Sequence, residues 1–273
     1  MSDYIFQVKT VQTSVFKTLI EALKDILTDG NIDLGAGNSQ NEDESEKGTI
    51  KIVALDPTQT VMVHLKLEGK YFEEYYCEKR TIIGVSMINL YKLIRTMTNN
   101  DILTLYITRE DPNKLGIKIE NSDKNQVTHY KLNLMDLTHS EVNIPPQSFD
   151  NVITMLSSDF QKICRDMSNL SDTIEITNVK NKLEFSCEGE FANQKTVLTE
   201  HIGLQFERQS DGFDIIQGFY NLKHLVLFTK CTNLSQNVQM FLKNDYPLII
   251  QYTVGSLGFL KLALAPQVKE NNI

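Results

Sequence analysis

The chain has no tryptophan, only six prolines and only four cysteines among its 273 residues. The cysteines, at 77, 164, 187 and 231, form no Cys-x-x-Cys pair and have no histidine at zinc-ligand spacing, which predicts reduced, buried thiols and no metal site. No apolar run approaches the roughly 20 residues of a membrane-spanning helix, and residues 1–9 lack the pattern of a signal peptide. We therefore expect an intracellular protein with no membrane partner and no cofactor.

The motifs of common enzymes are also absent. The five histidines are scattered along the chain and accompany no serine elbow, metal cluster or paired-carboxylate motif. Gly35-Ala36-Gly37 hints at a phosphate-binding loop, but the Gly-Lys-Ser/Thr that such a loop needs is missing. We predict no catalytic residues and no enzymatic activity.

The overall charge is acidic. The formal net charge is −8 and the sequence pI is about 5.2, whereas nucleic-acid-binding domains are usually basic. An acidic exterior can nevertheless coexist with a basic inner surface, so the positions of Lys and Arg decide the question.

Two kinds of segment alternate along the chain. Period-two apolar alternation predicts half-buried antiparallel strands over 61–67, 115–119, 183–187 and 248–254. Apolar stripes of helical period predict helices at about 14–27, 86–98, 158–169 and 220–231, the third with Ser158 as its N-cap. The segment at 33–48 is rich in Gly, Asn and Glu without any period, which predicts an exposed flexible loop inserted in the first half.

The order of helix, strands, helix, strands occurs twice and indicates a duplication. Phe16, Leu19 and Leu23 recur at a constant offset as Phe160, Ile163 and Met167. We predict an α+β fold of two topologically similar domains, with an N-terminal domain at 1–132 and a C-terminal domain at 149–273. A connector at 133–148, which holds Pro145-Pro146, would join them.

Each predicted helix carries two basic residues away from its apolar stripe. They are Lys17 and Lys24, Lys92 and Arg95, Lys162 and Arg165, and Lys223 and Lys230. Helix surfaces are routinely charged, and the nearby acids Glu21, Asp25 and Asp166 favour that ordinary interpretation. The alternative is one helix-lined surface that binds DNA phosphates without reading bases.

Four segments resemble proliferating cell nuclear antigen. They are 6–27 (FQVKTVQTSVFKTLIEALKDIL), 131–145 (KLNLMDLTHSEVNIP), 160–168 (FQKICRDMS) and 260–266 (LKLALAP). The similarity covers about residues 4 to 268, with an insertion at about 35–46 that suggests a viral or distant eukaryotic member.

The resemblance implies a DNA sliding clamp. Three chains would close head to tail into a ring around duplex DNA, with antiparallel sheets outside and four helices per chain on the inner face. Strands at 127–130 and 195–199 would pair between neighbouring subunits. The eight basic residues above match the DNA-facing positions of the family, although Thr18 replaces one further basic residue.

The resemblance also implies a pocket for a partner peptide with a glutamine, an aliphatic residue and two aromatics. Its positions here are Leu55, Met62, Val142, Ile144, Pro145, Pro247, Leu264, Ala265 and Pro266. Taken without the family, these would be ordinary core and linker residues. Ala263 replaces a usual aromatic, so the preferred peptide is expected to differ. Lys180 matches a lysine that carries ubiquitin in eukaryotic clamps.

The implied partners are duplex DNA, further copies of the chain, a DNA polymerase, a clamp loader and other proteins with the docking motif. The implied location is a replication site, in the nucleus or, for a virus, in a cytoplasmic replication factory. Two alternatives stay open. The chain could be one subunit of a heterotrimeric checkpoint-type clamp, or a decoy that binds replication proteins without encircling DNA.

Overall fold

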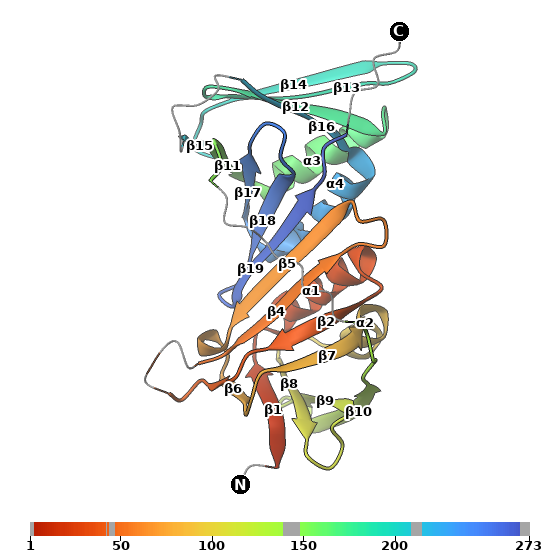
Figure 1. Cartoon of the computed structure of the whole chain (residues 1–273), viewed down its shortest axis with the longest axis vertical. Coiled ribbons are helices and arrows are strands. Elements are labelled where there is room, and N and C mark those ends of the chain that lie inside the picture. Colours follow the sequence, from red (N-terminus) through yellow and green to blue (C-terminus); the bar gives the residue numbers. More distant parts are fainter. Residues whose placement is uncertain (1–2, 42, 44–46, 139–147, 209–214, 268–273) are drawn as a thin grey trace. The chain divides into compact units, whose positions relative to one another are not determined.

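The computed structural model describes residues 3–41, 43, 47–138, 148–208 and 215–267. The chain divides into two compact units. Unit 1 comprises Met1–Ala54, Val63–Val142 and Thr253–Leu260, and unit 2 comprises Leu55–Met62, Asn143–Tyr252 and Lys261–Ile273. Each unit combines a pair of helices with antiparallel strands (Figure 1), as predicted for an α+β duplication.

Unit 1 holds two helices and most of the first ten strands; residues 55–62 belong to unit 2, and residues 253–260 of the last two strands belong to unit 1. In chain order the first elements are β1 (Tyr4–Thr10), α1 (Thr13–Ile26), β2 (Asp29–Leu34), β3 (Gly37–Asn38), β4 (Thr49–Leu55), β5 (Val61–Glu68), the short 3₁₀ helix η2 (Gly69–Tyr71), β6 (Glu74–Cys77), β7 (Thr81–Ser86), α2 (Met87–Ile94), β8 (Asp101–Thr108), β9 (Lys114–Asn121) and β10 (Gln126–Asn133). One sheet has the order β10-β9-β8-β1-β6-β3, and a second layer has the order β5-β4-β2-β7.

Unit 2 repeats this plan. Its elements are β11 (Asn151–Leu156), α3 (Ser157–Ser168), β12 (Thr173–Val179), β13 (Lys182–Glu188), β14 (Asn193–Thr199), β15 (Leu204–Arg208), β16 (Ile215–Asn221), α4 (Leu222–Phe228), the 3₁₀ helix η3 (Thr229–Leu234), β17 (Asn237–Leu242), β18 (Leu248–Val254) and β19 (Gly258–Leu264). A four-stranded sheet has the order β14-β13-β12-β16, and a second layer has the order β15-β11-β17-β18-β19.

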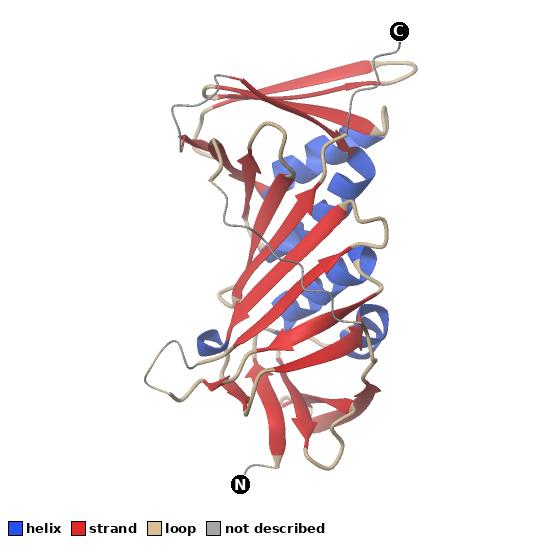
Figure 2. Cartoon of the chain, in the orientation of Figure 1, coloured by secondary structure: helices blue, strands red, loops and turns tan. Residues whose placement is uncertain are grey.

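The helices lie against one face of the strands in each unit (Figure 2). The α1 helix buries Phe16, Leu19, Leu23 and Ile26 of the apolar stripe predicted for it, whereas Val15 of that stripe is only half-buried. All four predicted strand patterns are confirmed. On β5, for example, Val61, Val63, Leu65 and Leu67 are at most 2% exposed, because every second side chain of a strand points to the core.

Three helix predictions were wrong in detail. The second helix, predicted over 86–98, spans only Met87–Ile94. The α3 helix begins at Ser157, so Ser158 lies inside the helix and is not its N-cap. The N-cap residue is Leu156, whose apolar side chain cannot cap the helix, and the Ser157 N–H instead donates to the Gln236 carbonyl at 2.9 Å. The fourth helix is α-helical only over Leu222–Phe228 and continues as η3. There the Thr229 hydroxyl donates to the Val226 carbonyl at 2.7 Å, a local bond that competes with regular helix geometry.

The prediction of a flexible loop at 33–48 was also wrong for the part of it that the structure describes. Asp33 and Leu34 end β2 and pair with β4, while Gly37 and Asn38 form β3, which adds an edge strand beside β6. The Tyr75 hydroxyl donates its hydrogen bond into this segment and lies 2.6 Å from the Gly35 carbonyl. Residues 42 and 44–46 lie outside the described residues.

Candidate functional site

The two helices of unit 1 bring the first four basic residues onto neighbouring elements. Lys17 and Lys24 lie on α1 and are half-buried, while Lys92 lies on α2 and Arg95 is its C-terminal cap residue, and both are exposed. The Nζ atom of Lys24 lies 4.9 Å from the centre of the Tyr91 ring, next to Lys92, so α1 and α2 meet at their basic residues. The spacing argument therefore placed these four side chains on one pair of helices.

The two lysines of α1 already have partners within the unit. The Lys17 ammonium donates to the Met97 carbonyl at 2.8 Å, and the Lys24 ammonium lies 2.8 Å from the Asp25 carboxylate. Any anion that approached Lys24 would therefore have to compete with the Asp25 carboxylate. This competition was not predicted, although Asp25 was recognised as an acidic neighbour.

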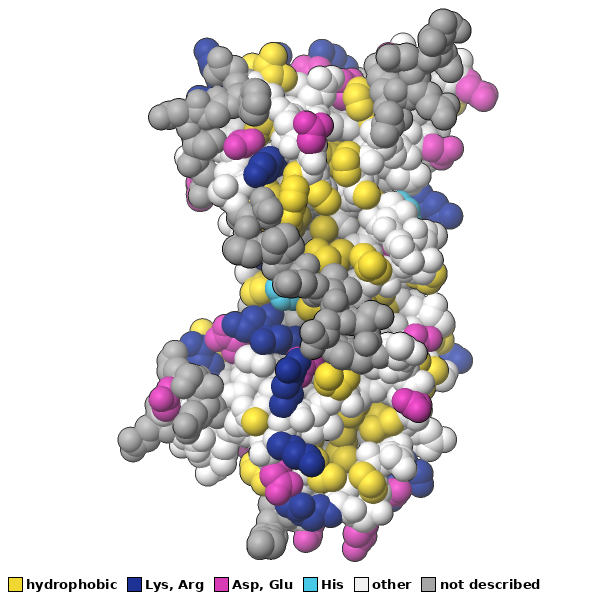
Figure 3. Space-filling view, in the orientation of Figure 1, with side chains coloured by type: hydrophobic (Ala, Val, Ile, Leu, Met, Phe, Trp, Pro, Cys, Tyr) yellow, Lys and Arg dark blue, Asp and Glu magenta, His cyan; other side chains and the backbone are white. Residues whose placement is uncertain are grey.

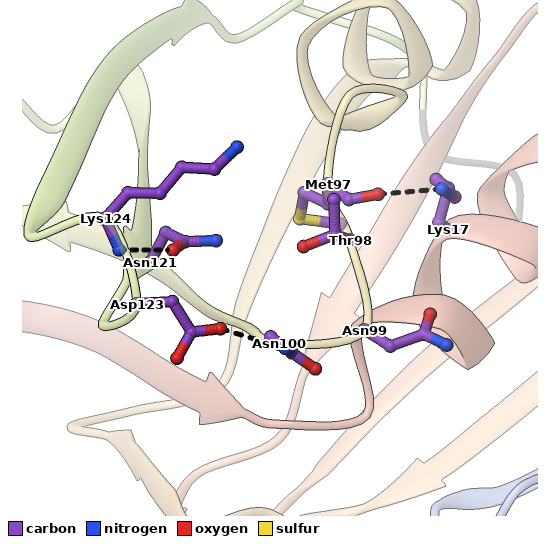
Figure 4. A pocket seen from close by; sticks show the side chains of 8 residues that line it. All are labelled: Lys17, Met97, Thr98, Asn99, Asn100, Asn121, Asp123 and Lys124. Atoms are coloured by element: carbon purple, nitrogen blue, oxygen red, sulfur yellow. Dashed lines mark hydrogen bonds between the residues drawn. The ribbon is translucent and has the colours of Figure 1, made fainter.

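A polar hollow of about 540 Å³ opens beside Lys17 (Figure 4). It is formed by the loop after α2 and the β9–β10 turn, and its lining also includes Lys124, Asn99 and Asn100. The buried Asp101 braces the two loops, because it accepts the Thr98 N–H at 2.7 Å and the Asn121 side-chain amide. Lys124 was not among the predicted basic residues, because it lies in a turn and the prediction used only spacing along helices.

Unit 2 has a corresponding arrangement. Lys162 and Arg165 on α3 and Lys223 on α4 are exposed. Lys230 is exposed too, but it lies on η3, so it does not stand two α-helical turns from Lys223 as predicted. The Gln161 amide donates to the Thr229 carbonyl at 3.0 Å and joins α3 to η3 beside their basic residues.

The cations on the strands differ from those on the helices. Figure 3 shows the strand face of the chain, where basic and acidic side chains lie close together over unit 1. On that face Lys66 pairs with Glu68 at 3.1 Å and Arg80 pairs with Asp33 at 2.9 Å. Among the described residues, Lys92, Arg95, Lys162, Arg165 and Lys223 have no such ion pair, so no carboxylate in contact neutralises these five helix cations.

Both strands proposed from the resemblance for subunit pairing lie at sheet edges. β10 ends the six-stranded sheet and β14 ends the four-stranded sheet. Gly189 N–H donates to the Ala192 carbonyl, and hydrogen-bonded pairs recur every second residue along an antiparallel ladder. The backbone groups of Lys195, Val197 and Thr199 therefore point away from β13.

The same argument applies to β10. Leu134 N–H donates to the Asn113 carbonyl at 2.9 Å, and the register pairs Leu132 with Leu115 and Tyr130 with Ile117. The backbone groups of Val127, His129 and Lys131 consequently face away from β9. Each unit thus carries a strand with a row of outward N–H and C=O groups, which is a template for pairing with another chain.

Six of the nine predicted peptide-pocket residues are described, and all six belong to unit 2. Leu55 is 44% exposed, Met62 and Pro247 are half-buried, and Pro266 is exposed. Leu264 is fully buried, so it supports Ala265 and Pro266 from the core and offers no surface of its own. Val142, Ile144 and Pro145 lie outside the described residues.

Lys180 is at the tip of the β12–β13 hairpin, exposed, with a left-handed backbone φ of 53°. The buried Asn178 amide holds this turn by donating to the Lys180 carbonyl at 3.1 Å and the Lys182 carbonyl at 3.0 Å. A neighbouring buried amide, that of Asn151, donates to Asn178 in turn. The lysine is thus presented on a rigid hairpin.

The cysteine thiols are not accessible at the surface. All four cysteines are buried and unpaired, and burial raises the pKa of the Cys77 thiol to about 11 and that of Cys231 to about 12. In the described ranges, no group of three His, Cys, Asp or Glu side chains could hold a metal ion. No helix there is long and apolar enough to cross a membrane.

Comparison with known proteins gives a consistent result. The family models for the proliferating cell nuclear antigen N-terminal and C-terminal domains match residues 5–142 and 143–267. A "Probable DNA polymerase sliding clamp 1" of Paramecium bursaria Chlorella virus 1 is 34% identical over 97% of both chains. Proliferating cell nuclear antigen of Chaetomium thermophilum is 28% identical, over 98% of this chain and 100% of that protein.

A solved structure agrees with these sequence relatives. Proliferating cell nuclear antigen from Entamoeba histolytica superposes with a TM-score of 0.85 and 27% identity, over 97% of this chain and 100% of that one. The predicted two-domain clamp fold is therefore confirmed, as is the prediction of a non-enzymatic protein, since members of this family act as scaffolds. The chain belongs to the proliferating cell nuclear antigen family of DNA sliding clamps.

Proposed function

We propose that three copies of this chain form a closed ring that encircles duplex DNA and tethers a DNA polymerase and other replication and repair proteins. The observation that carries the ring is the pair of unpaired edge strands, β10 and β14, one in each unit. If β10 of one copy pairs with β14 of the next, the contact is heterologous and repeats around a ring until it closes. Pairing would remove both exposed edges.

In this ring the eight helix cations, Lys17, Lys24, Lys92, Arg95, Lys162, Arg165, Lys223 and Lys230, contact DNA phosphates. These contacts are independent of sequence and weaken with salt, which suits a protein that must move along the duplex. The net charge of −8 then resides mainly on other surfaces. Tethering raises the effective concentration of the polymerase at the primer end.

Partner proteins dock through the pocket that contains Leu55, Met62, Pro247, Ala265 and Pro266. In this proposal the domains are 1–132 and 149–273, and the connector at 133–148 completes the pocket. Lys180 serves as a modification site, for which its exposed position on a rigid hairpin is suitable.

The ring is tested by Val197→Pro. Proline removes an outward N–H of β14 and leaves the ladder to β13 intact, so the chain should fold and fail to assemble. Light scattering on a sizing column should give about 94 kDa for the wild type, three times the 31.2 kDa chain, and about 31 kDa for the variant. The control is Thr196→Pro, whose N–H faces β13; this variant should lose thermal stability instead.

A wild-type chain that is monomeric at every concentration, without DNA or a loader, would favour the heterotrimeric checkpoint-type clamp or the decoy. Stimulation of a polymerase on primed circular DNA separates a clamp from a decoy. Charge reversal of Lys92, Arg95, Lys162 and Arg165 should abolish stimulation by a clamp, most visibly at high salt, and should leave the activity of a decoy unchanged.

A further inference from the structure

A buried carboxylate organises the turn between β4 and β5. Asp56 is 7% exposed, and its Oδ1 atom accepts the N–H groups of Thr60 at 2.8 Å and Val61 at 2.7 Å. Its Oδ2 atom accepts the Thr58 N–H at 3.3 Å and the Thr58 hydroxyl. Gln59, in the middle of the turn, has a left-handed φ of 57°, which these bonds hold in place.

This turn contacts the segment that follows β19. The Thr60 carbonyl accepts the Ala265 N–H at 3.1 Å, and two residues later the Gln267 N–H donates to the Phe219 carbonyl at 2.7 Å. Between these two anchors Pro266 is exposed, and before them Leu264 is buried. The wall formed by residues 264–266 is therefore fixed by backbone hydrogen bonds at Ala265 and, just beyond it, at Gln267.

We propose that Asp56 is a positioning residue for the partner-peptide pocket, acting through the Thr60 carbonyl on the wall at 264–266. This inference rests on the peptide docking proposed above. Asp56 does not need to touch the peptide. Its carboxylate fixes the turn, the turn fixes the Thr60 carbonyl, and the carbonyl fixes Ala265 beside Pro266.

The geometry requires an ionised carboxylate. Both Asp56 oxygens accept hydrogen bonds, and an asparagine would place an NH₂ group against either the Thr58 or the Thr60 and Val61 donors. Asp56→Asn thus keeps the size of the side chain but removes one of the two acceptor oxygens on which the turn depends. Burial alone would raise the pKa of Asp56, but the bonds from Thr58, Val61 and Thr60 outweigh it and lower the pKa.

Asp101→Asn is the matched control. Asp101 is also buried, 6% exposed, and also accepts a backbone N–H, that of Thr98, but it lies in unit 1. The two variants are expected to lose similar thermal stability. Only Asp56→Asn should speed amide hydrogen exchange at Ala265, by about tenfold, because an unsatisfied turn no longer holds the Thr60 carbonyl.

Peptide affinity supplies the second readout. The probe is a synthetic peptide with one glutamine, one aliphatic residue and two aromatics, titrated calorimetrically against the full-length chain. We expect its Kd to rise about tenfold for Asp56→Asn and to stay unchanged for Asp101→Asn. Asp56→Ser, which retains one acceptor oxygen, should give an intermediate loss in both readouts and serves if the asparagine variant does not fold.

The outcomes distinguish this inference from the proposed function. If the wild type binds the peptide, and Asp56→Asn changes neither this affinity nor the protection of the Ala265 amide from hydrogen exchange, the positioning role alone is overturned. A wild-type chain that does not bind the peptide overturns the docking function, and the positioning role with it.

Discussion

The ion pair between Lys24 and Asp25 leads to a prediction that distinguishes a DNA-binding helix surface from an ordinary charged one. On α1 the two charged groups lie 2.8 Å apart, and their side chains are only 21% and 23% exposed. A phosphate that approaches Lys24 must displace or share this carboxylate. Asp25→Asn removes the competitor and keeps the side-chain size, so DNA affinity should increase.

The size of the increase follows from the environment of the pair. Exposed ion pairs contribute about 0.2–1 kcal/mol, and this one belongs near the upper end because most of both side chains is covered. Release of Lys24 is then expected to strengthen DNA binding by about fivefold for each subunit that contacts a phosphate. The gain should shrink with added salt, since screening weakens both the pair and the phosphate contact.

The assay is fluorescence anisotropy of a labelled duplex over a series of salt concentrations. Asp166→Asn, on α3, is the control, because it changes the net charge equally but removes a carboxylate that has no ion pair among the described residues. A double-mutant cycle of Lys24→Ala and Asp25→Asn isolates the coupling. Equal gains from the two asparagine variants, or a coupling of zero, would refute the competition between Asp25 and DNA.

Three further predictions concern the pocket, acid stability and the Lys180 hairpin. Ile144→Ala combined with Pro266→Ala should abolish peptide binding with the ring still formed; unchanged affinity by calorimetric titration would show that the pocket is misassigned. Burial would raise the pKa values of Asp56 and Asp101, but their hydrogen bonds outweigh it and lower both pKa values. The stability that these two carboxylates provide is therefore complete above the unfolded-state pKa of about 3.9, and it is lost as pH falls through their folded-state pKa values. The melting temperature should therefore drop more steeply below about pH 4 for the wild type than for Asp56→Asn or Asp101→Asn. Asn178→Ala leaves the Lys180 and Lys182 carbonyls without their donor and should cost about 1–3 kcal/mol in chemical denaturation, whereas a cost near zero would mean that water replaces the amide.

The parts of the fold that could be predicted from sequence are those in which the spacing of apolar residues along one helix or strand decides which side chains are buried. The stripe of α1 and the alternation of β5 depend on which side chains must leave water, and both are visible in a single segment. β3 could not be found in this way. Its two residues, Gly37 and Asn38, are a strand only because Cys77 and Tyr76 of β6 lie opposite them.

The candidate site shows the same division. Helical spacing identified the basic residues, since three and seven positions return to one side of a helix. It could not show that Lys24 contacts Tyr91 and Asp25, or that helix geometry changes before Lys230. The proposed role of Asp56 was invisible for a similar reason, because the link runs through the Thr60 carbonyl to the N–H of Ala265, which is distant in sequence.

The partial neutralisation of the helix cations would suit the proposed ring, which has to slide along DNA. A cation that binds phosphate strongly would hold the protein at one position, whereas many weak contacts supply affinity and let each one break separately. Lys17 already donates a hydrogen bond to the Met97 carbonyl, and Lys24 already forms an ion pair with Asp25. Lys92, Arg95, Lys162 and Arg165 are exposed and lack an ion pair within the described chain, so they can supply most of the electrostatic attraction. The net charge of −8 would by itself repel DNA. We therefore predict that removal of the four exposed cations weakens DNA binding far more than removal of the two lysines on α1.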